Sequence, residues 1–271
     1  MKRLIAIELQ KIWKNKASRI LTLTYFILLT FIALIASIKF DIGPIEIKAV
    51  EQGVFNFPYI WHFNAYIGVY GKLFFAIVIV SMVANEYSYG TLKQNLIDGM
   101  SKKEFLLSKF YTILLFSIIS TLFIFIISII LGLLFSSYNE IGIIFSRMEY
   151  LIAYFLNILG FFTFCLFVGL LIKRSAFALG FIILWFLFEV FLIHSNINFP
   201  DFLKQFLPLQ AISDLIVEPF TKLGAIKTVK SQLSMDQFKD YTLHWQTILI
   251  VVSWIIILMI SSYNLLKKRD L

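Results

Sequence analysis

Long uncharged apolar runs alternate with short charged segments along this 271-residue chain. At about 1.5 Å per residue, a helix of roughly 20 apolar residues crosses the hydrocarbon layer of a bilayer. Five or six runs reach that length, and we predict an all-α integral membrane protein with six spans in a single transmembrane domain covering residues 1–271. The predicted spans are residues 20–38, 64–85, 105–136, 150–172, 175–194 and 243–266.

In the N-terminal segment, residues 1–18, the apolar residues recur at helical spacing on one face and do not form a long uncharged run. Leu9 and Trp13 fall on an apolar stripe, while Glu8 and Lys11 are among the polar residues mostly opposite it. A basic amphipathic helix with Trp at its apolar edge is typical of a helix that lies along a membrane surface. The alternative is that this segment only anchors the first span by its charge.

A second segment outside the spans, residues 195–240, is divided by Pro200, Pro208 and Pro219. Its pieces, such as 202–207 and 211–216, are apolar enough to rest in the outer membrane interface as short helices. We therefore predict short external helices here rather than a soluble domain.

The composition fits this interpretation, with 60% hydrophobic residues and a mean hydropathy of +0.87. The net charge of +8 does not indicate a nucleic-acid partner, because basic residues cluster at the ends of the spans. On one side lie 15 of the 24 basic residues and 5 acidic ones, a net of +10, against −2 on the other. This predicts a multi-pass protein of a cell membrane (bacterial inner or plasma membrane), with both termini in the cytoplasm.

Candidate catalytic or metal-binding groups are sparse. The three histidines lie near the predicted outer face without a cysteine or repeated carboxylate spacing, and Cys165 lies inside an apolar run. Residues 68–72 superficially resemble a phosphate loop, but the glycines are too close together, and no Walker A sequence occurs. We expect neither an enzyme nor a bound metal or cofactor, and an intramembrane enzyme is the least supported alternative.

The most polar segment between two spans runs from Glu86 to Lys109. Residues 86–98 can form a short helix, which Gly99 would end in a left-handed conformation. Ser101 and Glu104 then match a capping box at the start of the next helix. We predict a rigid cytoplasmic helix–turn–helix; a plain solvated loop is the alternative.

The motif in this segment resembles the pattern of ABC-2 type transporter permeases. That pattern, Glu-x-x-x-Gly-Thr-Leu followed by Ser-x-x-Glu-x-Leu-Leu-x-Lys, corresponds here to Glu86, Gly90, Thr91, Leu92, Ser101, Glu104, Leu106, Leu107 and Lys109. The family is commonly written with Pro two residues before the Ser, where this chain has Gly99. The motif covers some 25 residues, while the architecture agrees over the whole chain.

The resemblance implies a permease subunit, usually of an exporter, that forms a homodimer or heterodimer with a second permease. ATP and Mg²⁺ would bind to a separate ABC ATPase subunit, which would hydrolyse the ATP. Residues 86–98 would be the coupling helix, and residues 1–18 the neighbouring connecting helix. The ATPase-coupling residues would then be Glu86, Gly90, Thr91, Leu92, Gly99, Ser101 and Glu104.

Two charged residues, Lys72 and Glu189, lie inside predicted spans, where charge is costly and usually paired or functional. Lys72 lies 14 residues before Glu86, and Glu189 lies 15 residues after Arg174. Both therefore sit roughly 21–23 Å from the cytoplasmic edge. We hypothesise that they pair, within or across subunits, as part of an outer gate; the alternative is that each snorkels independently toward the outer headgroups.

A second functional class is a membrane assembly or bacteriocin-immunity component that uses the same fold without pumping. Dependence on a partner ATPase would separate it from an exporter. The spans are rich in Phe, Ile and Leu and mildly favour lipid-like or amphipathic cargo over small ions.

Overall fold

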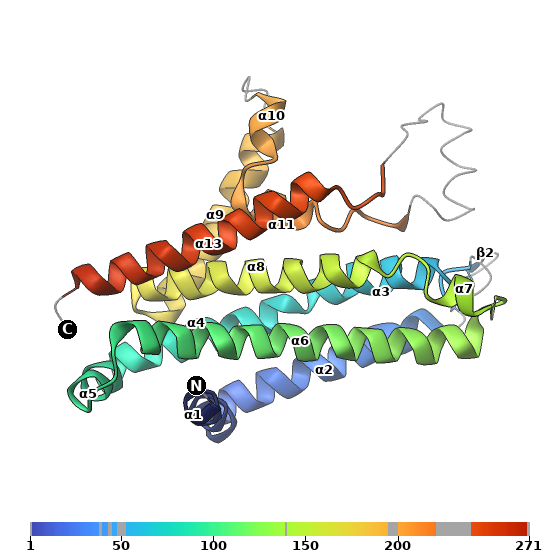
Figure 1. The fold of residues 1–271 in the computed structure, drawn as a ribbon. Helices are drawn as coiled ribbons and strands as arrows, with labels where there is room; N and C mark the ends of the chain where they lie inside the picture. Colours follow the sequence, from blue (N-terminus) through green and yellow to red (C-terminus); the bar gives the residue numbers. More distant parts are fainter. Residues whose placement is uncertain are drawn as a thin grey trace.

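A computed structural model of the chain describes residues 2–37, 40–42, 45–47, 53–138, 140–194, 200–220 and 240–269. Its helices and strands follow in chain order (Figure 1): α1 (Lys2–Lys14), α2 (Lys16–Ser37), β1 (Phe40–Ile42), β2 (Ile45–Ile47), α3 (Tyr59–Tyr70), α4 (Lys72–Ser88), α5 (Thr91–Ile97), α6 (Lys102–Phe135), α7 (Ile141–Ile144), α8 (Glu149–Ile172), α9 (Ser175–His194), α10 (Asp201–Lys204), α11 (Pro208–Ser213) and α13 (Trp245–Lys268).

Long apolar helices dominate this part of the chain, which confirms an all-helical membrane-type architecture. Four helical segments are long and apolar enough to cross a membrane: α6, α7–α8 taken together, α9 and α13. The α3–α4 pair passes the same test as one bent unit, which brings the number to as many as five. Strands β1 and β2 form a small antiparallel hairpin that the all-α prediction did not include.

Helix α8 forms the centre of the bundle, in contact with α13, α4, α6, α3 and α9. Its most apolar stretch is 72% buried inside the protein, whereas that of α9 is only 17% buried. The glycines of α8 permit this close packing: a side chain at Gly160 would reach within 3.2 Å of Ile212, on α11. Helix α9, by contrast, diverges steeply from the bundle in Figure 1 and leaves most of its apolar surface exposed.

The second predicted span is broken, which corrects the prediction of one helix over residues 64–85. Helices α3 and α4 meet at Gly71 with a bend of 44°. At this point α2 approaches closely, because a Cβ atom at Gly71 would lie 2.9 Å from the ring of Tyr25. Glycine therefore allows the aromatic ring of one helix to press against the backbone of the next. The glycines that looked like a false phosphate loop have this packing role.

The remaining boundaries differ from the predicted ones by a few residues, except in two places. The N-terminal helix α1 ends at Lys14 rather than at residue 18, because the side chain of Asn15 accepts a hydrogen bond from the amide of Ser18 and caps α2. Residues 86–98 do not form one helix, since Glu86 belongs to the last turn of α4. The predicted external helices correspond to α10 and α11, while 195–199 and 221–239 lie outside the described residues.

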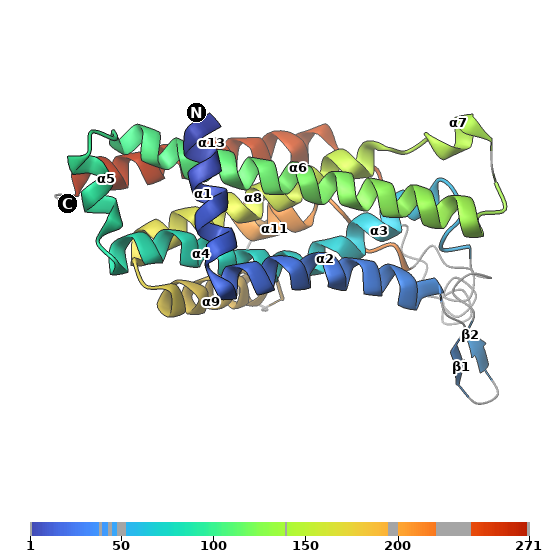
Figure 2. The same ribbon diagram turned by 90° about the horizontal axis from the view of Figure 1, so that it is seen from below.

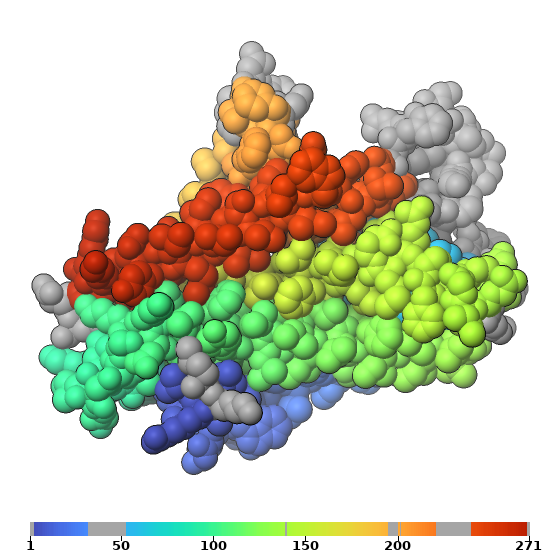
Figure 3. Space-filling model, in the orientation of Figure 1, coloured from blue at the N-terminus to red at the C-terminus, as the bar shows by residue number. Residues whose placement is uncertain are grey.

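The bundle has two distinct ends in both ribbon views. Helix α5 and the described C-terminus lie at one end, and α7 and the β1–β2 hairpin lie at the other (Figures 1 and 2). Helix α1 lies across the bundle rather than along it (Figure 2), in contact with α6 and α2. The space-filling view shows α1 seated beneath α6 and α13 running above α6 (Figure 3).

Candidate functional site at the α5 end of the bundle

The segment between α4 and α6 is a compact helix–turn–helix. Gly90 immediately precedes α5 and has a φ of +68°, and Gly99, two residues after the end of α5, has a φ of +95°. Both values are left-handed and favour glycine, so each glycine marks a sharp change of chain direction. The left-handed Gly99 predicted from the sequence is confirmed. Proline, with its φ near −65°, does not fit the conformation that Gly99 adopts here.

The capping box at the start of α6 also forms as predicted. The Ser101 hydroxyl accepts from the Glu104 amide at 3.1 Å, and the Glu104 carboxylate accepts from the Ser101 amide at 2.9 Å. These reciprocal bonds satisfy amide groups that would otherwise have no partner at a helix start. They fix the direction in which α6 leaves the turn.

Helix α5 is anchored to the bundle by Leu92 and exposes several of its other side chains. Leu92 is buried against the bundle, whereas Tyr89 and Ile97 are each 75% exposed. Lys93 and Gln94 are exposed between them. This short helix at the tip of the molecule, with exposed aliphatic and charged side chains and the exposed Tyr89 just before it, is available for contact with another protein.

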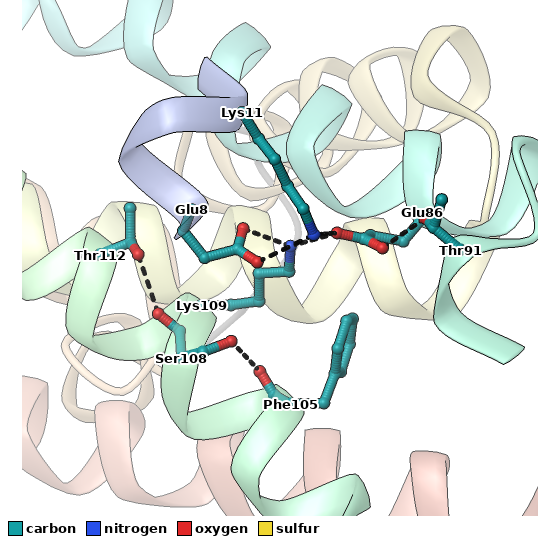
Figure 4. Close-up of polar contacts among 8 residues, drawn as sticks. All are labelled: Glu8, Lys11, Glu86, Thr91, Phe105, Ser108, Lys109 and Thr112. Carbon is teal, nitrogen blue, oxygen red and sulfur yellow. Dashed lines mark hydrogen bonds and ion pairs between the residues drawn. The ribbon is translucent and has the colours of Figure 1, made fainter. Parts of the chain in front are cut away.

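Four charged side chains meet behind α5, and we refer to Glu8, Lys11, Glu86 and Lys109 as the ion cluster (Figure 4). Lys109 Nζ lies 2.5 Å from Glu8 Oε2 and 2.7 Å from Glu86 Oε1. Lys11 Nζ lies 2.7 Å from the same Glu86 oxygen and 3.3 Å from Glu8 Oε1. The cluster therefore joins α1, α4 and α6.

The first residue of α5 is attached to the same cluster. The Thr91 hydroxyl donates to Glu86 Oε2 at 2.5 Å, so the two oxygens of one carboxylate contact both α5 and the lysines (Figure 4). Glu86 and Thr91, two residues of the predicted motif, are thus in direct contact. Any displacement of the α5 start acts directly on the carboxylate that holds α1, α4 and α6 together.

Burial and charge balance explain why the cluster stays intact. Glu8 and Glu86 are 4% and 3% exposed, and the side chain of Lys109 is fully buried. Two carboxylates and two ammonium groups cancel, which offsets the loss of hydration that isolated charges would suffer. Lys109 also lies 5.2 Å from the centre of the Phe105 ring, a favourable position for a cation.

Lys11 is the exposed member of the cluster, with 40% of its side chain accessible. Partial burial lowers its pKa, but the hydrogen bond to Glu86 and the charges of Glu8 and Glu86 outweigh that effect. The pKa of Lys11 is therefore raised above its ordinary value. Its ammonium group is therefore charged at neutral pH.

The sequence identified only part of this arrangement. Glu86 and Thr91 were predicted as site residues and are hydrogen-bonded to each other. Glu8 and Lys11 were placed on the polar face of an interfacial helix, whereas Glu8 is buried in the bundle and Lys11 pairs with Glu86. The spacing of Glu8 and Lys11, three positions apart on one helix, was the one sequence signal for an ion pair here, but such pairs are common on exposed surfaces.

The predicted pair of Lys72 and Glu189 does not form within this chain, because each has other partners. Lys72 Nζ donates to Asn157 Oδ1 at 3.0 Å. Glu189 accepts from the amides of Leu209 and Gln210 at 3.2 and 2.8 Å, and so caps the N-terminus of α11. Pairing within one subunit is therefore wrong; pairing across subunits stays a prediction.

Within the described residues, no three histidine, cysteine or carboxylate side chains converge as a metal site would require. The chemistry available at the α5 end is that of ion pairs, hydrogen bonds and an exposed contact surface. This arrangement can transmit a displacement or hold a partner.

Comparison with known proteins gives a family and one short similarity. Over 63 residues, the chain is 43% identical to "Uncharacterized protein YhcI" of Bacillus subtilis (strain 168). That match covers 23% of this chain and 20% of the Bacillus protein. Residues 50–271 match the family described as "Protein of unknown function (DUF2705)". Because the match extends over more than half of the chain, this protein belongs to the DUF2705 family.

Proposed function

We propose that this protein is the membrane-spanning permease subunit of an ABC-2 type exporter, driven by a separate ATPase subunit. Its six spans would be α2, the broken pair α3–α4, α6, α8, α9 and α13. The excess of basic residues at the α5 end supports placing that end and both termini in the cytoplasm. A second permease subunit would complete the transporter.

The observation that carries this proposal is the connection between α5 and the ion cluster. An exposed helix at the tip of a membrane bundle is linked, through Thr91 and Glu86, to three other helices. A partner that moves α5 would therefore move α4, α6 and α1 with it. A plain solvated loop has no need of such a buried connection, since burying the charges of Glu8, Glu86 and Lys109 is costly unless all are paired.

The proposed coupling follows from the geometry. The ATPase would bind the exposed surface of α5 around Tyr89 and Ile97, and closure of its subunits on ATP would displace α5. Gly90 would act as the pivot, because α4 ends just before it and α5 begins just after it. Transmission to α4 would then tilt the lower part of the broken span against its upper part at Gly71.

A site-specific crosslink tests this assignment. A photoreactive benzoyl-phenylalanine at Ile97 should crosslink to a protein with a Walker A sequence when the full chain is expressed in its own host. Phe145 is the matched control, because it is an exposed aromatic residue at the opposite end of the bundle. The measurement is mass spectrometry of the crosslinked product.

Two results would contradict the proposal. One is equal crosslinking from Ile97 and Phe145, which would mean that α5 has no dedicated partner. The other is a specific partner at Ile97 that lacks a nucleotide-binding sequence, which would favour a non-pumping assembly or immunity role.

A further inference from the structure

A cavity of about 690 Å³ lies between α3–α4, α8, α9 and the α11 segment, away from the ion cluster. Its size is within the range of protein sites for small molecules, roughly 300–1,000 Å³. The walls are mostly apolar, with Leu73, Phe161, Ile182 and Ile212 among them. A ligand for this cavity therefore has a substantial hydrocarbon part.

Lys72 contributes the positive charge of this cavity, and its described partners are neutral. Its ammonium group donates one hydrogen bond to Asn157, at 3.0 Å, and lies 4.6 Å from the centre of the Phe161 ring. No carboxylate lies within ion-pair distance of it among the described residues. An ammonium group has three hydrogen-bond donors, so two remain for a ligand. Charge in an apolar cavity favours an oppositely charged partner.

Two carboxylates also line the cavity and limit the charge that it accepts. Asp214 is exposed and accepts a hydrogen bond from Gln210, at 2.7 Å, while Glu218 is half-buried. The exposed carboxylate of Asp214 repels a headgroup with several negative charges. A headgroup with one negative charge can contact Lys72 while pointing away from the carboxylates, so it is attracted by the ammonium group and little repelled by the carboxylates.

The outer wall of the cavity indicates where a ligand enters. Ile183 and Phe186, on α9, line the cavity and are also 59% and 52% exposed. Because α9 diverges from the bundle, these side chains separate the cavity from the surface that faces hydrocarbon in a membrane. A ligand that entered past this wall would come from the bilayer itself.

We propose that this cavity binds a membrane phospholipid with a single negative charge, whose phosphate contacts Lys72 and whose acyl chain lies along α8 and α9. The site does not depend on coupling to an ATPase, and it goes beyond the function proposed above. Asn157 holds the ammonium group in place by linking it to α11: its amide nitrogen donates to the carbonyl of Ile212 at 2.5 Å.

The test is a lipid titration of the purified full-length chain in detergent, followed by native mass spectrometry. The probes are dioleoyl phosphatidylglycerol and uncharged dioleoylglycerol, which have identical acyl chains. The Lys72→Met variant should bind phosphatidylglycerol at least about tenfold more weakly, since a hydrogen bond to a charged group is lost. Its affinity for dioleoylglycerol should stay within twofold of the original chain.

Further variants separate recognition from folding. Ile183→Trp fills the cavity while keeping Lys72 and should weaken phosphatidylglycerol binding. Lys72→Arg keeps the charge and should retain binding. Lys16→Met removes an exposed charge from the start of α2 and should bind phosphatidylglycerol as the original chain does.

Two outcomes would overturn the site. Phosphatidylglycerol affinity within twofold of the original in both Lys72→Met and Ile183→Trp would show that the lipid binds elsewhere. An equal loss of both probes in Lys72→Met would show that the charge is not recognised. If Lys72→Met fails to fold, the comparison of Ile183→Trp with Lys72→Arg gives the same decision.

Discussion

The protein buries charge in two different ways, in the ion cluster and in the middle of the bundle. At the α5 end, two carboxylates and two ammonium groups cancel each other and join three helices, with Thr91 attaching a fourth. In the middle, Lys72 and Glu189 each have neutral partners: an amide oxygen and an aromatic ring for one, backbone amides and the Trp185 indole for the other.

The difference indicates two kinds of role. A neutral, fully paired cluster gains little from a further ligand, so its effect is to hold helices together. A charge whose partners are all neutral is not cancelled, so it can still attract an opposite charge or stabilise the end of a nearby helix. Glu189 stabilises the N-terminus of α11, and Lys72 is available to attract a negatively charged ligand.

Removal of the most buried lysine should break the ion cluster and gives the largest expected effect. In Lys109→Met, the buried carboxylates of Glu8 and Glu86 would be left close together with the partly exposed Lys11 as their one remaining shared cation. Leaving a buried charge unpaired costs about 3–5 kcal/mol, so the thermal unfolding temperature in detergent should fall markedly. Lys103→Met, which removes an exposed lysine from the same helix, is the control. Equal stability of the two variants would mean that the cluster does not hold the helices together.

A charge swap tests whether the two charges in the middle of the bundle, Lys72 and Glu189, act independently. Lys72→Glu and Glu189→Lys should each destabilise the protein by about 1–3 kcal/mol, since each leaves buried hydrogen-bonding groups unsatisfied. The double swap should show no compensation beyond about 0.5 kcal/mol, because the two residues have separate partners in this chain. Unfolding of all three variants in detergent measures this. Recovery in the double swap would instead indicate pairing across subunits.

The smallest effect is expected for the exposed member of the ion cluster. Lys11→Met should lower stability by about 1 kcal/mol or less, because its partly exposed ion pairs are screened by solvent. The raised pKa of Lys11 implies that its contribution is complete below the ordinary value of 10.5 and is lost as pH rises through the folded-state value.

Hydrogen exchange of the α1 amides measures this contribution. Protection of α1 should be constant from pH 6 to 9, after correction for the intrinsic exchange rate, in the original chain. A loss of protection within that interval would contradict the raised pKa. The Lys14→Met variant, at an exposed position on the same helix, is the control.

The features that were predicted correctly depend on residues close together in the sequence. Predicted span 175–194 coincides with α9, and those at 150–172 and 243–266 differ from α8 and α13 by two residues or fewer at each end. Gly99 and the Ser101–Glu104 capping box also follow from neighbouring residues alone. Short-range bonds and runs of apolar side chains need no knowledge of the rest of the fold.

Features that depend on distant segments were missed or misassigned. Glu8 and Lys109 lie 101 positions apart in the sequence, and nothing near either residue shows that they meet. The bend at Gly71 lies where the ring of Tyr25, from another helix, packs against the backbone. Equal depth in a bilayer made Lys72 and Glu189 a plausible pair, but depth does not specify which faces of their helices meet.

The sequence by itself thus determined the membrane-type helices, the accumulation of basic residues at the ends of the predicted spans and the turn at Gly99 after α5. Hydropathy, charge and left-handed glycine conformations are properties of single residues and their immediate neighbours. The tertiary structure decided which charges neutralise each other, where a span breaks and where a cavity remains. Those outcomes depend on how helices far apart in the sequence pack together, because a buried charge takes whichever partner the fold brings within a few ångströms.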